Sequence, residues 1–461
     1  MLTRIREWLT VILVALLPLH AFIVTFKTKL LLGPGNAPLT ALTLWKEVLL
    51  LVILGLAVIE IWRQWQRDPK QISEFDRIDA IVVCLFLLAA VVSVLTFQNV
   101  ELMLYGVKYD LVPLFAFLIL RRVSWSKEFT HNVLQALLLV GCVVALYGIA
   151  ALFLPIGFFK VIGYSDLHSL YLPGGPLPAF HQIGETGLRR LQSTLSGPNQ
   201  AGLWLLIPYC LALLFTLRRP DAHRAAMTLL IGVALALSFS RAAWIAAAVI
   251  TFISLRTHLS QKFPRHHIVS AGGIIVVALV IITVWEPSLI LRFASSRDHM
   301  ARPLAAIQRM IEQPWGTGLG TAGPASNRVS DVCVSVPAGA DTSWAADRPD
   351  LCVFAGDEQV QPLDRECNCP FLPENWYLQI GVELGWIGMA LFVGLILLVL
   401  SKLRAASRLR SESYAGLAEG IFLAMLGISL AALFLHAWED SAVAYSIWIL
   451  AATTTQLRAR L

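Results

Sequence analysis

Apolar runs long enough to cross a lipid bilayer recur along most of the chain, separated by short charged connections. A membrane-spanning helix needs about 17 to 25 mostly apolar residues, and by that measure the pattern predicts about twelve such helices. Their approximate limits are 8–26, 42–62, 79–97, 103–120, 133–154, 200–217, 225–239, 242–256, 268–285, 376–400, 415–435 and 441–456. We therefore expect an all-α, polytopic membrane protein in which residues 1–461 form a single integral membrane domain.

Two connections are much longer than the others. Residues 155–198 are rich in proline and glycine, and residues 286–374 are charged and contain no apolar run long enough to span. The span order places both segments on the same side of the membrane. Long loops in membrane proteins usually carry function, so we expect the chemistry of this protein on that side.

Composition excludes an ordinary soluble protein, because 57% of the residues are hydrophobic, 14% are charged and the mean hydropathy is +0.70. The net charge of +6 does not indicate a nucleic-acid partner, since the basic residues lie in short clusters between apolar runs. Such clusters encode membrane orientation. The short connections on the side of the membrane that holds the N-terminus contain most of the Lys and Arg residues. This predicts that both termini face the cytoplasm.

Four of the seven cysteines fall in the 286–374 segment: Cys333, Cys352, Cys367 and Cys369. Four cysteines in an extracytoplasmic, oxidising compartment predict two disulfides, and the sequence leaves all three pairings open. The alternative is a zinc site. The Cys-Asn-Cys spacing is too tight for one and a second ligand pair is missing, so we expect no metal.

The stretch RLQSTLSGPN, residues 190–199, joins a polar loop to an apolar helix. Pro198 suits the first turn of a helix, and Ser196 and Asn199 are capping residue types. A helix N-terminus beside Arg189 and Arg190 predicts an anion site, and phosphate is the anion that suits it best. The other interpretation is that the two arginines anchor the helix at the lipid headgroups.

Two further polar positions sit at the outer ends of predicted spans. Arg241 lies between the spans 225–239 and 242–256, where it is either an interfacial anchor beside Trp244 or a ligand for a lipid phosphate. Glu374 precedes the span 376–400, where it is either a general base or an N-terminal cap.

Other features of the outer segment admit simpler explanations. Residues 302–312 have apolar positions at helical spacing and predict an amphipathic helix lying on the membrane. Residues 318–323 match a dinucleotide-binding pattern, but they lack the strand and the fold around it, so they predict a turn.

Ionisable residues within or beside spans are functional candidates: Lys108 and Asp110, which we expect to neutralise each other in part, together with Glu383, His436, Glu439 and Asp440.

Taken in order, four motifs resemble those of the O-antigen ligase and polymerase superfamily: RLQSTLSGPN (190–199), SFSRAAW (238–244), PWGTGLG (314–320), and ENWYLQ with ELGWIG (374–379 and 383–388). The resemblance covers roughly residues 185–400. It depends on the order of the motifs and on their places relative to the spans, because no single motif is diagnostic.

The resemblance implies a glycosyltransferase of the bacterial inner membrane that moves a glycan from undecaprenyl pyrophosphate to a glycolipid or glycan acceptor on the periplasmic face. It implies no metal and no cofactor. By position, Arg190 and Arg241 match the arginines assigned to the lipid pyrophosphate.

Many members of the superfamily have His at the position of Glu374, so this departure leaves the base open among Glu374, His181 and His168. We assign catalysis to Glu374, Arg241 and Arg190. Substrate binding is assigned to Arg189, Asn199, Arg302, Asn375 and His181.

The sequence does not separate a ligase, a repeat-unit polymerase and a protein O-oligosaccharyltransferase, which share these motifs. A polysaccharide transporter or flippase is the alternative from another functional class, and the number of spans suits it. The concentration of polar motifs at one face favours the enzyme.

Overall fold

The computed structural model describes residues 1–33, 36, 38–67, 75–97, 99–165, 181–183, 187–259, 293–408 and 412–455. The predicted span 268–285 and the candidate base His168 lie outside the described residues.

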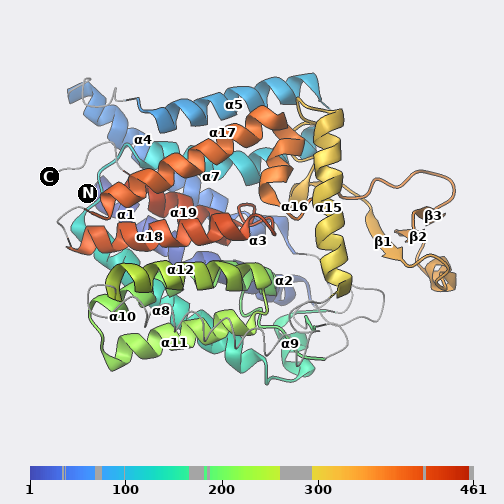
Figure 1. Ribbon diagram of the computed structural model, residues 1–461, viewed down its shortest axis with the longest axis horizontal. Helices are drawn as coiled ribbons and strands as arrows, with labels where there is room; N and C mark the ends of the chain where they lie inside the picture. Colours follow the sequence, from blue (N-terminus) through green and yellow to red (C-terminus); the bar gives the residue numbers. More distant parts are fainter. Residues whose placement is uncertain are drawn as a thin grey trace.

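Most of the described chain is helical, and its long helices lie side by side in one bundle (Figure 1). The helices are α1 (Leu2–Leu16), α2 (His20–Leu32), α3 (Thr40–Thr43), α4 (Trp45–Arg67), α5 (Arg77–Leu95), α6 (Val100–Gly106), α7 (Val112–Leu120), α8 (Lys127–Ala151), α9 (Ile156–Ile162), α10 (Pro198–Arg218), α11 (Ala222–Leu237), α12 (Arg241–Leu259), α15 (Phe293–Glu312), α16 (Gly323–Ser326), α17 (Trp376–Ala406), α18 (Glu412–Ala431) and α19 (Ser441–Thr454). A π-helical turn, η3 (Val107–Leu111), joins α6 to α7.

Within the described residues, seven helical segments are long and apolar enough to cross a membrane. They are Leu2–Leu32, Arg77–Leu95, Val100–Leu120, Lys127–Ala151, Pro198–Arg218, Trp376–Ala406 and Tyr414–Ala431. These segments support a polytopic membrane protein. Every predicted span other than 268–285 overlaps a described helix, but the full set of twelve stays a prediction.

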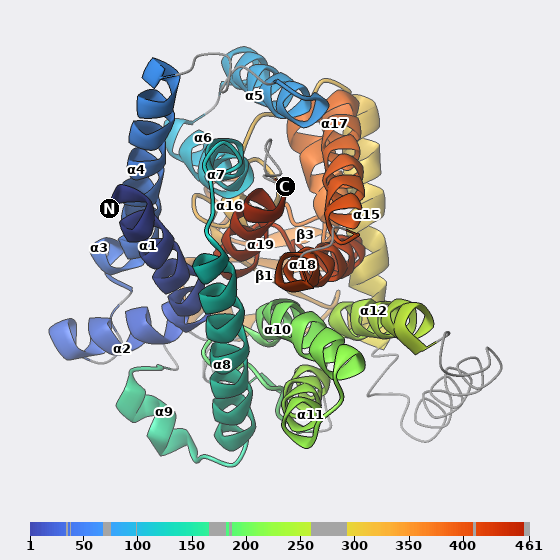
Figure 2. The same cartoon turned by 90° about the vertical axis from the view of Figure 1, so that its left-hand side faces the viewer.

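Helix α10 lies inside the bundle, between α8, α11, α12 and α18 (Figure 2). Apolar residues surround this helix on all sides, and Trp204 in its first half is fully buried. A helix that is hydrophobic all round belongs in a core. Its N-terminus, which carries the predicted anion site, is therefore held by packing on several sides.

Helix α17 is kinked at Gly385, whose backbone is not helical (φ 72°). A side chain there would come within 2.3 Å of the Pro314 carbonyl oxygen, so the glycine lets the loop after α15 pack directly on the kink. Glu383, predicted to lie within a span, is placed in the first part of this helix, before the change of direction at Gly385.

The start of α1 and the end of α19 lie at the same end of the bundle, as their contacts with the segment 121–126 show. Near the N-terminus, Arg6 donates to the Ser124 carbonyl (2.7 Å), and Glu7 accepts from the Ser126 N–H (2.6 Å). After α19, the Thr455 carbonyl accepts from Arg121 (3.3 Å). This agrees with the predicted alternation of spans, while the side of the membrane stays a prediction.

Helix α15 crosses the opposite end of the bundle, nearly perpendicular to the long helices (Figure 1). Ala306 and Met310 are buried, whereas Leu304 and Ile311 are 64% and 67% exposed. The amphipathic helix predicted for residues 302–312 is thus present, and it starts earlier. Its exposed apolar residues suit a membrane surface.

Beyond α15 a small β-subdomain projects from the bundle (Figure 1). Its strands are β1 (Val332–Val336), β2 (Leu351–Ala355) and β3 (Glu358–Gln361), with β1 parallel and β3 antiparallel to β2. The disulfides Cys333–Cys369 and Cys352–Cys367 join this sheet to the segment that leads into α17. Two disulfides were predicted; the sheet was not, because its strands are too short to stand out from a polar loop.

A buried ion pair holds the end of the bundle where the termini lie. Asp79 is fully buried and contacts Arg121 (2.9 Å) and Arg122 (3.1 Å). We predict that Asp79→Ala lowers the free energy of unfolding by about 3 kcal/mol or more, because it leaves the buried Arg121 guanidinium without one of its carboxylates. The measurement is the unfolding midpoint of the purified protein in detergent.

The control is Asp350→Ala, which removes the exposed partner of Arg348 and should leave the midpoint nearly unchanged. Equal shifts in the two variants would contradict a special structural role for Asp79.

Candidate functional site

One large cavity, of about 1620 Å³, opens among the parts of the chain that the predicted motifs occupy. It is larger than a typical small-molecule pocket of about 300 to 1000 Å³, which gives it room for two substrates. Arg190, Asn199, Arg241, Glu374 and His436 are among the residues that line it. These five residues, separated by up to 246 positions in the sequence, thus share one cavity.

Arg190 is fastened at the N-terminus of α10. Its Nε donates to the Ser238 carbonyl (3.0 Å), and its Nη2 donates to Asn199 Oδ1 (2.8 Å) and to the Phe239 carbonyl (3.3 Å). The cap of α10 is Gly197 rather than Ser196 or Asn199, which corrects the predicted capping. Asn199 instead orients Arg190.

Arg241 is the first residue of α12 and lines the same cavity. The turn that precedes it contains Ser238 and Phe239, whose carbonyls bind Arg190. This turn therefore connects Arg190 to the start of α12, and the two arginines line the same cavity although they are 51 residues apart in the sequence. Arg241 also interacts electrostatically with Glu374.

Helix N-termini reinforce the positive potential of the cavity. Residues at the starts of α10, α12 and α19 line it, and each helix start carries a partial positive charge and N–H groups that its own helix does not use. Two arginines combined with these N-termini form an environment suited to an anion that carries more than one charge.

Glu374 lies at the cavity, one residue before the cap of α17. Its carboxylate forms an ion pair with Arg302 of α15, and its backbone N–H donates to His436 Nε2 (3.2 Å). The side chain that caps α17 is Asn375, which accepts from the Leu378 N–H (3.1 Å). The capping interpretation of Glu374 is therefore wrong, and its carboxylate instead pairs with Arg302 beside the cavity.

The remaining predicted substrate-binding residues contact other parts of the protein. Arg189 donates to the carbonyls of Ala151, Leu152 and Leu154, so its guanidinium closes the C-terminal end of α8. Asn375 donates to the Leu433 carbonyl (3.0 Å) in addition to capping α17. These contacts favour structural roles for both side chains, in place of the substrate contacts that we expected.

Arg302 contacts the site through its ion pair with the Glu374 carboxylate. His181 contacts the backbone of Arg190: its carbonyl accepts a hydrogen bond from the Arg190 N–H (2.8 Å). Burial and the neighbouring Arg190 guanidinium lower the pKa of His181 to about 4, so its ring is neutral near pH 7.

Lys46 and Lys108, which also line the cavity, form a second set of charged residues there. Lys46 and Lys108 both contact Glu47 Oε1, at 3.1 Å each. Lys108 therefore does not pair with Asp110 as we predicted. Lys46 and Glu47 were not singled out in the sequence, although a Lys-Glu pair at the edge of an apolar run was the available signal.

Three carboxyl groups are buried close together, and one of them, Glu439, belongs to a residue that lines the cavity. Asp110, Glu383 and Glu439 lie close enough to interact electrostatically with one another. Glu383 also accepts the Ala322 backbone N–H (3.2 Å). Three carboxylates cannot all remain ionised in such a place, so at least one carries a proton and can donate a hydrogen bond.

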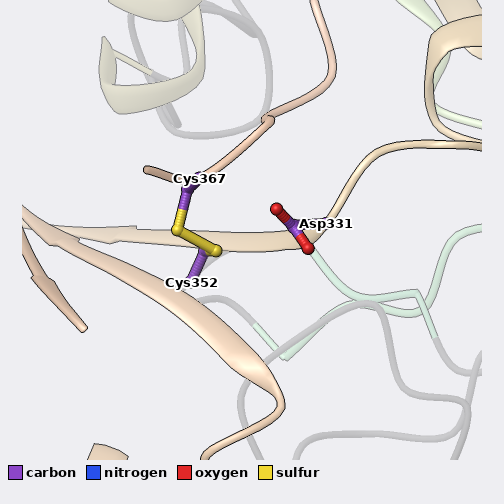
Figure 3. Close-up of side chains that lie close together, drawn as sticks. All are labelled: Asp331, Cys352 and Cys367. Atoms are coloured by element: carbon purple, nitrogen blue, oxygen red, sulfur yellow. A yellow bond between two sulfur atoms is a disulfide. The ribbon is translucent and has the colours of Figure 1, made fainter. Parts of the chain in front are cut away.

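In the β-subdomain, Asp331, Cys352 and Cys367 lie close enough together to suggest a metal site (Figure 3). The two sulfur atoms form a disulfide and offer no thiolate, and Asp331 pairs with Arg365 (2.8 Å). This group is therefore structural.

The glycine spacing of residues 318–323, which resembles a dinucleotide-binding pattern, is explained in part by packing. At Gly323 (φ 69°), a side chain would come within 2.2 Å of Gln379 Oε1, so this glycine is needed for the close approach of the loop to α17.

Compared with known proteins, the chain matches no family model and no curated sequence.

Proposed function

We propose that this protein is a glycosyltransferase of the bacterial inner membrane, which moves a glycan from undecaprenyl pyrophosphate to an acceptor hydroxyl on the periplasmic face. The observation that carries the proposal is the convergence of Arg190, Arg241 and the N-termini of α10 and α12 on one cavity that also contains Glu374. In this proposal twelve helices span the membrane, both termini are cytoplasmic, and the cavity opens to the periplasm.

The two arginines have the chemistry that departure of a lipid pyrophosphate requires. As the bond between the sugar and the phosphate oxygen breaks, negative charge develops on the leaving group. Guanidinium groups that are already held by carbonyls stabilise this charge with little reorganisation. Arg190 is held in this way by Ser238 and Phe239.

Glu374 is the base in this proposal. Its pair with Arg302 favours the ionised carboxylate, which can accept the proton of the acceptor hydroxyl. The acceptor oxygen then bonds to the anomeric carbon, and undecaprenyl pyrophosphate leaves with the electron pair of the broken bond. A single displacement of this kind inverts the anomeric configuration.

Replacement of either arginine tests the pyrophosphate site. We predict that Arg241→Ala and Arg190→Ala each lower glycan transfer by about 100- to 1000-fold at unchanged protein level, as loss of a preorganised charge-stabilising donor does. Lysine should restore only part of the activity, because it lacks the planar fork that binds two oxygens. The measurement is surface polysaccharide in a deletion strain that carries each variant.

Arg348→Ala is the control, since Arg348 lies in the β-subdomain and pairs with Asp350. Wild-type glycan with Arg241→Ala would refute the site. A flippase would be indicated if the lipid-linked donor accumulated on the cytoplasmic face instead of the periplasmic face.

Glu374→Gln tests the base. The amide keeps the size of the side chain but cannot accept the proton, so transfer should fall by about 100- to 10000-fold with unchanged donor affinity. The measurement is transfer rate against donor concentration in membranes.

Glu312→Gln on the exposed end of α15 is the matched control and should be neutral. A weakened donor affinity at an unchanged maximal rate would assign Glu374 to binding instead.

A further inference from the structure

The backbone of Glu374 adopts a conformation that L-residues rarely take. Its φ is +53°, in the left-handed region, and the next residue returns to an extended conformation as the cap of α17. A non-glycine residue stays in this region only where its surroundings hold it, and such positions concentrate at functional sites.

His436 provides a contact that holds this backbone. It lies in the connection between α18 and α19, and its Nε2 accepts the Glu374 N–H (3.2 Å). Nε2 must therefore carry a lone pair, so in the neutral ring the proton is on Nδ1. Nδ1 then donates to Gln379 Oε1 (2.6 Å). Burial lowers the pKa of His436 to about 4, which keeps the ring neutral near pH 7.

Gln379 fixes this tautomer. Its Nε2 donates to Glu439 Oε1 (2.6 Å), which leaves its Oε1 directed at His436. Gln379 is fully buried, and Gly323 packs against its amide group. A reversed amide would present N–H groups to His436 and its oxygen to Glu439, and both hydrogen bonds would be lost in the present protonation states.

Glu439 can serve as the acceptor in either protonation state. Burial and the nearby Asp110 raise the pKa of Glu439, so a proton on Oε2 still leaves Oε1 able to accept from Gln379. Glu439, Gln379 and His436 therefore form a hydrogen-bonded array with a single direction, which ends at the backbone of Glu374.

We propose that His436 is a positioning residue: oriented by Gln379 and Glu439, it holds the Glu374 backbone in the left-handed conformation that places the carboxylate at the cavity. This inference rests on the proposed function, because the base role of Glu374 is what gives the positioning its effect on rate. In this proposal the array acts on the rate through Glu374.

Two substitutions of His436 separate its two hydrogen bonds. The His436→Asn amide lies near the place of Nδ1, so it can still donate to Gln379 but cannot reach the Glu374 N–H. The His436→Gln amide oxygen lies near the place of Nε2, so it can accept from Glu374, although Gln379 Oε1 loses its donor. The first substitution removes the positioning contact and the second retains it.

We expect His436→Asn to lower the maximal rate of transfer by about 10- to 100-fold, the loss that displacement of a catalytic group by about 1 Å produces. Donor affinity should be unchanged. His436→Gln should remain close to the wild-type rate, with a lower unfolding midpoint. In a Glu374→Gln background, His436→Asn should cause no further loss, because the residue through which it acts no longer works as a base.

Substitution of Glu439 tests the same array if a His436 variant does not fold. Glu439→Leu removes the acceptor of Gln379 Nε2, so the amide loses the contact that orients it and holds His436 less firmly against the Glu374 N–H. It should therefore lose rate as His436→Asn does. Glu439→Gln retains an acceptor oxygen and should be nearly neutral.

The inference is overturned if His436→Asn and His436→Gln lose rate equally, or if His436→Asn still lowers the rate in the Glu374→Gln background. It is also overturned if His436→Asn and Glu439→Leu match the wild type while Glu374→Gln is impaired, and the proposed function then stands without it. If Glu374→Gln and Arg241→Ala are both without effect, the proposed function itself is wrong, and this inference falls with it.

Discussion

The central constraint on this protein is that two guanidinium groups share one cavity within a largely apolar bundle. Arg190 and Arg241 are held on either side of the turn between α11 and α12, where backbone carbonyls bind Arg190 and the start of α12 carries Arg241. Both cations line one cavity, and the Glu374 carboxylate there interacts with Arg241 and offsets only part of their combined positive charge. An anion with more than one charge would balance the site, which is why a diphosphate is the ligand we propose.

The rest of the structure keeps this arrangement rigid. Helix α10 is buried on all sides, so its N-terminus cannot move without disturbing several neighbours. Arg189 and the His181 carbonyl fix the loop that carries Arg190, through contacts to the end of α8 and to the Arg190 backbone. The kink at Gly385 brings the loop after α15 against the first part of α17, where Gly316 packs on Glu383 and Gly323 on Gln379. Preorganised charges of this kind stabilise a leaving group with little reorganisation.

Much of the fold could be predicted from the sequence, because the length of apolar runs reports directly on membrane-spanning helices. The motif order also indicated which polar residues to consider, and Arg190, Asn199, Arg241 and Glu374 do share a cavity. Side-chain partners could not be predicted in the same way. Arg189 and Arg190 are adjacent and chemically identical, yet one closes α8 and the other lines the cavity, since the direction of each side chain depends on packing. The contact of His436 with Glu374 depends on a loop 62 residues away, and no local pattern indicates it.

The most direct test of the account is the affinity of the purified protein for undecaprenyl pyrophosphate. Wild-type protein should bind this lipid, and Arg190→Ala and Arg241→Ala should each weaken binding by about tenfold or more, since each removes charge-assisted hydrogen bonds to the diphosphate. The variant with both substitutions should bind weakest. Equal affinity of the wild-type and doubly substituted proteins would contradict the account, because the cavity would then have no role in holding the donor.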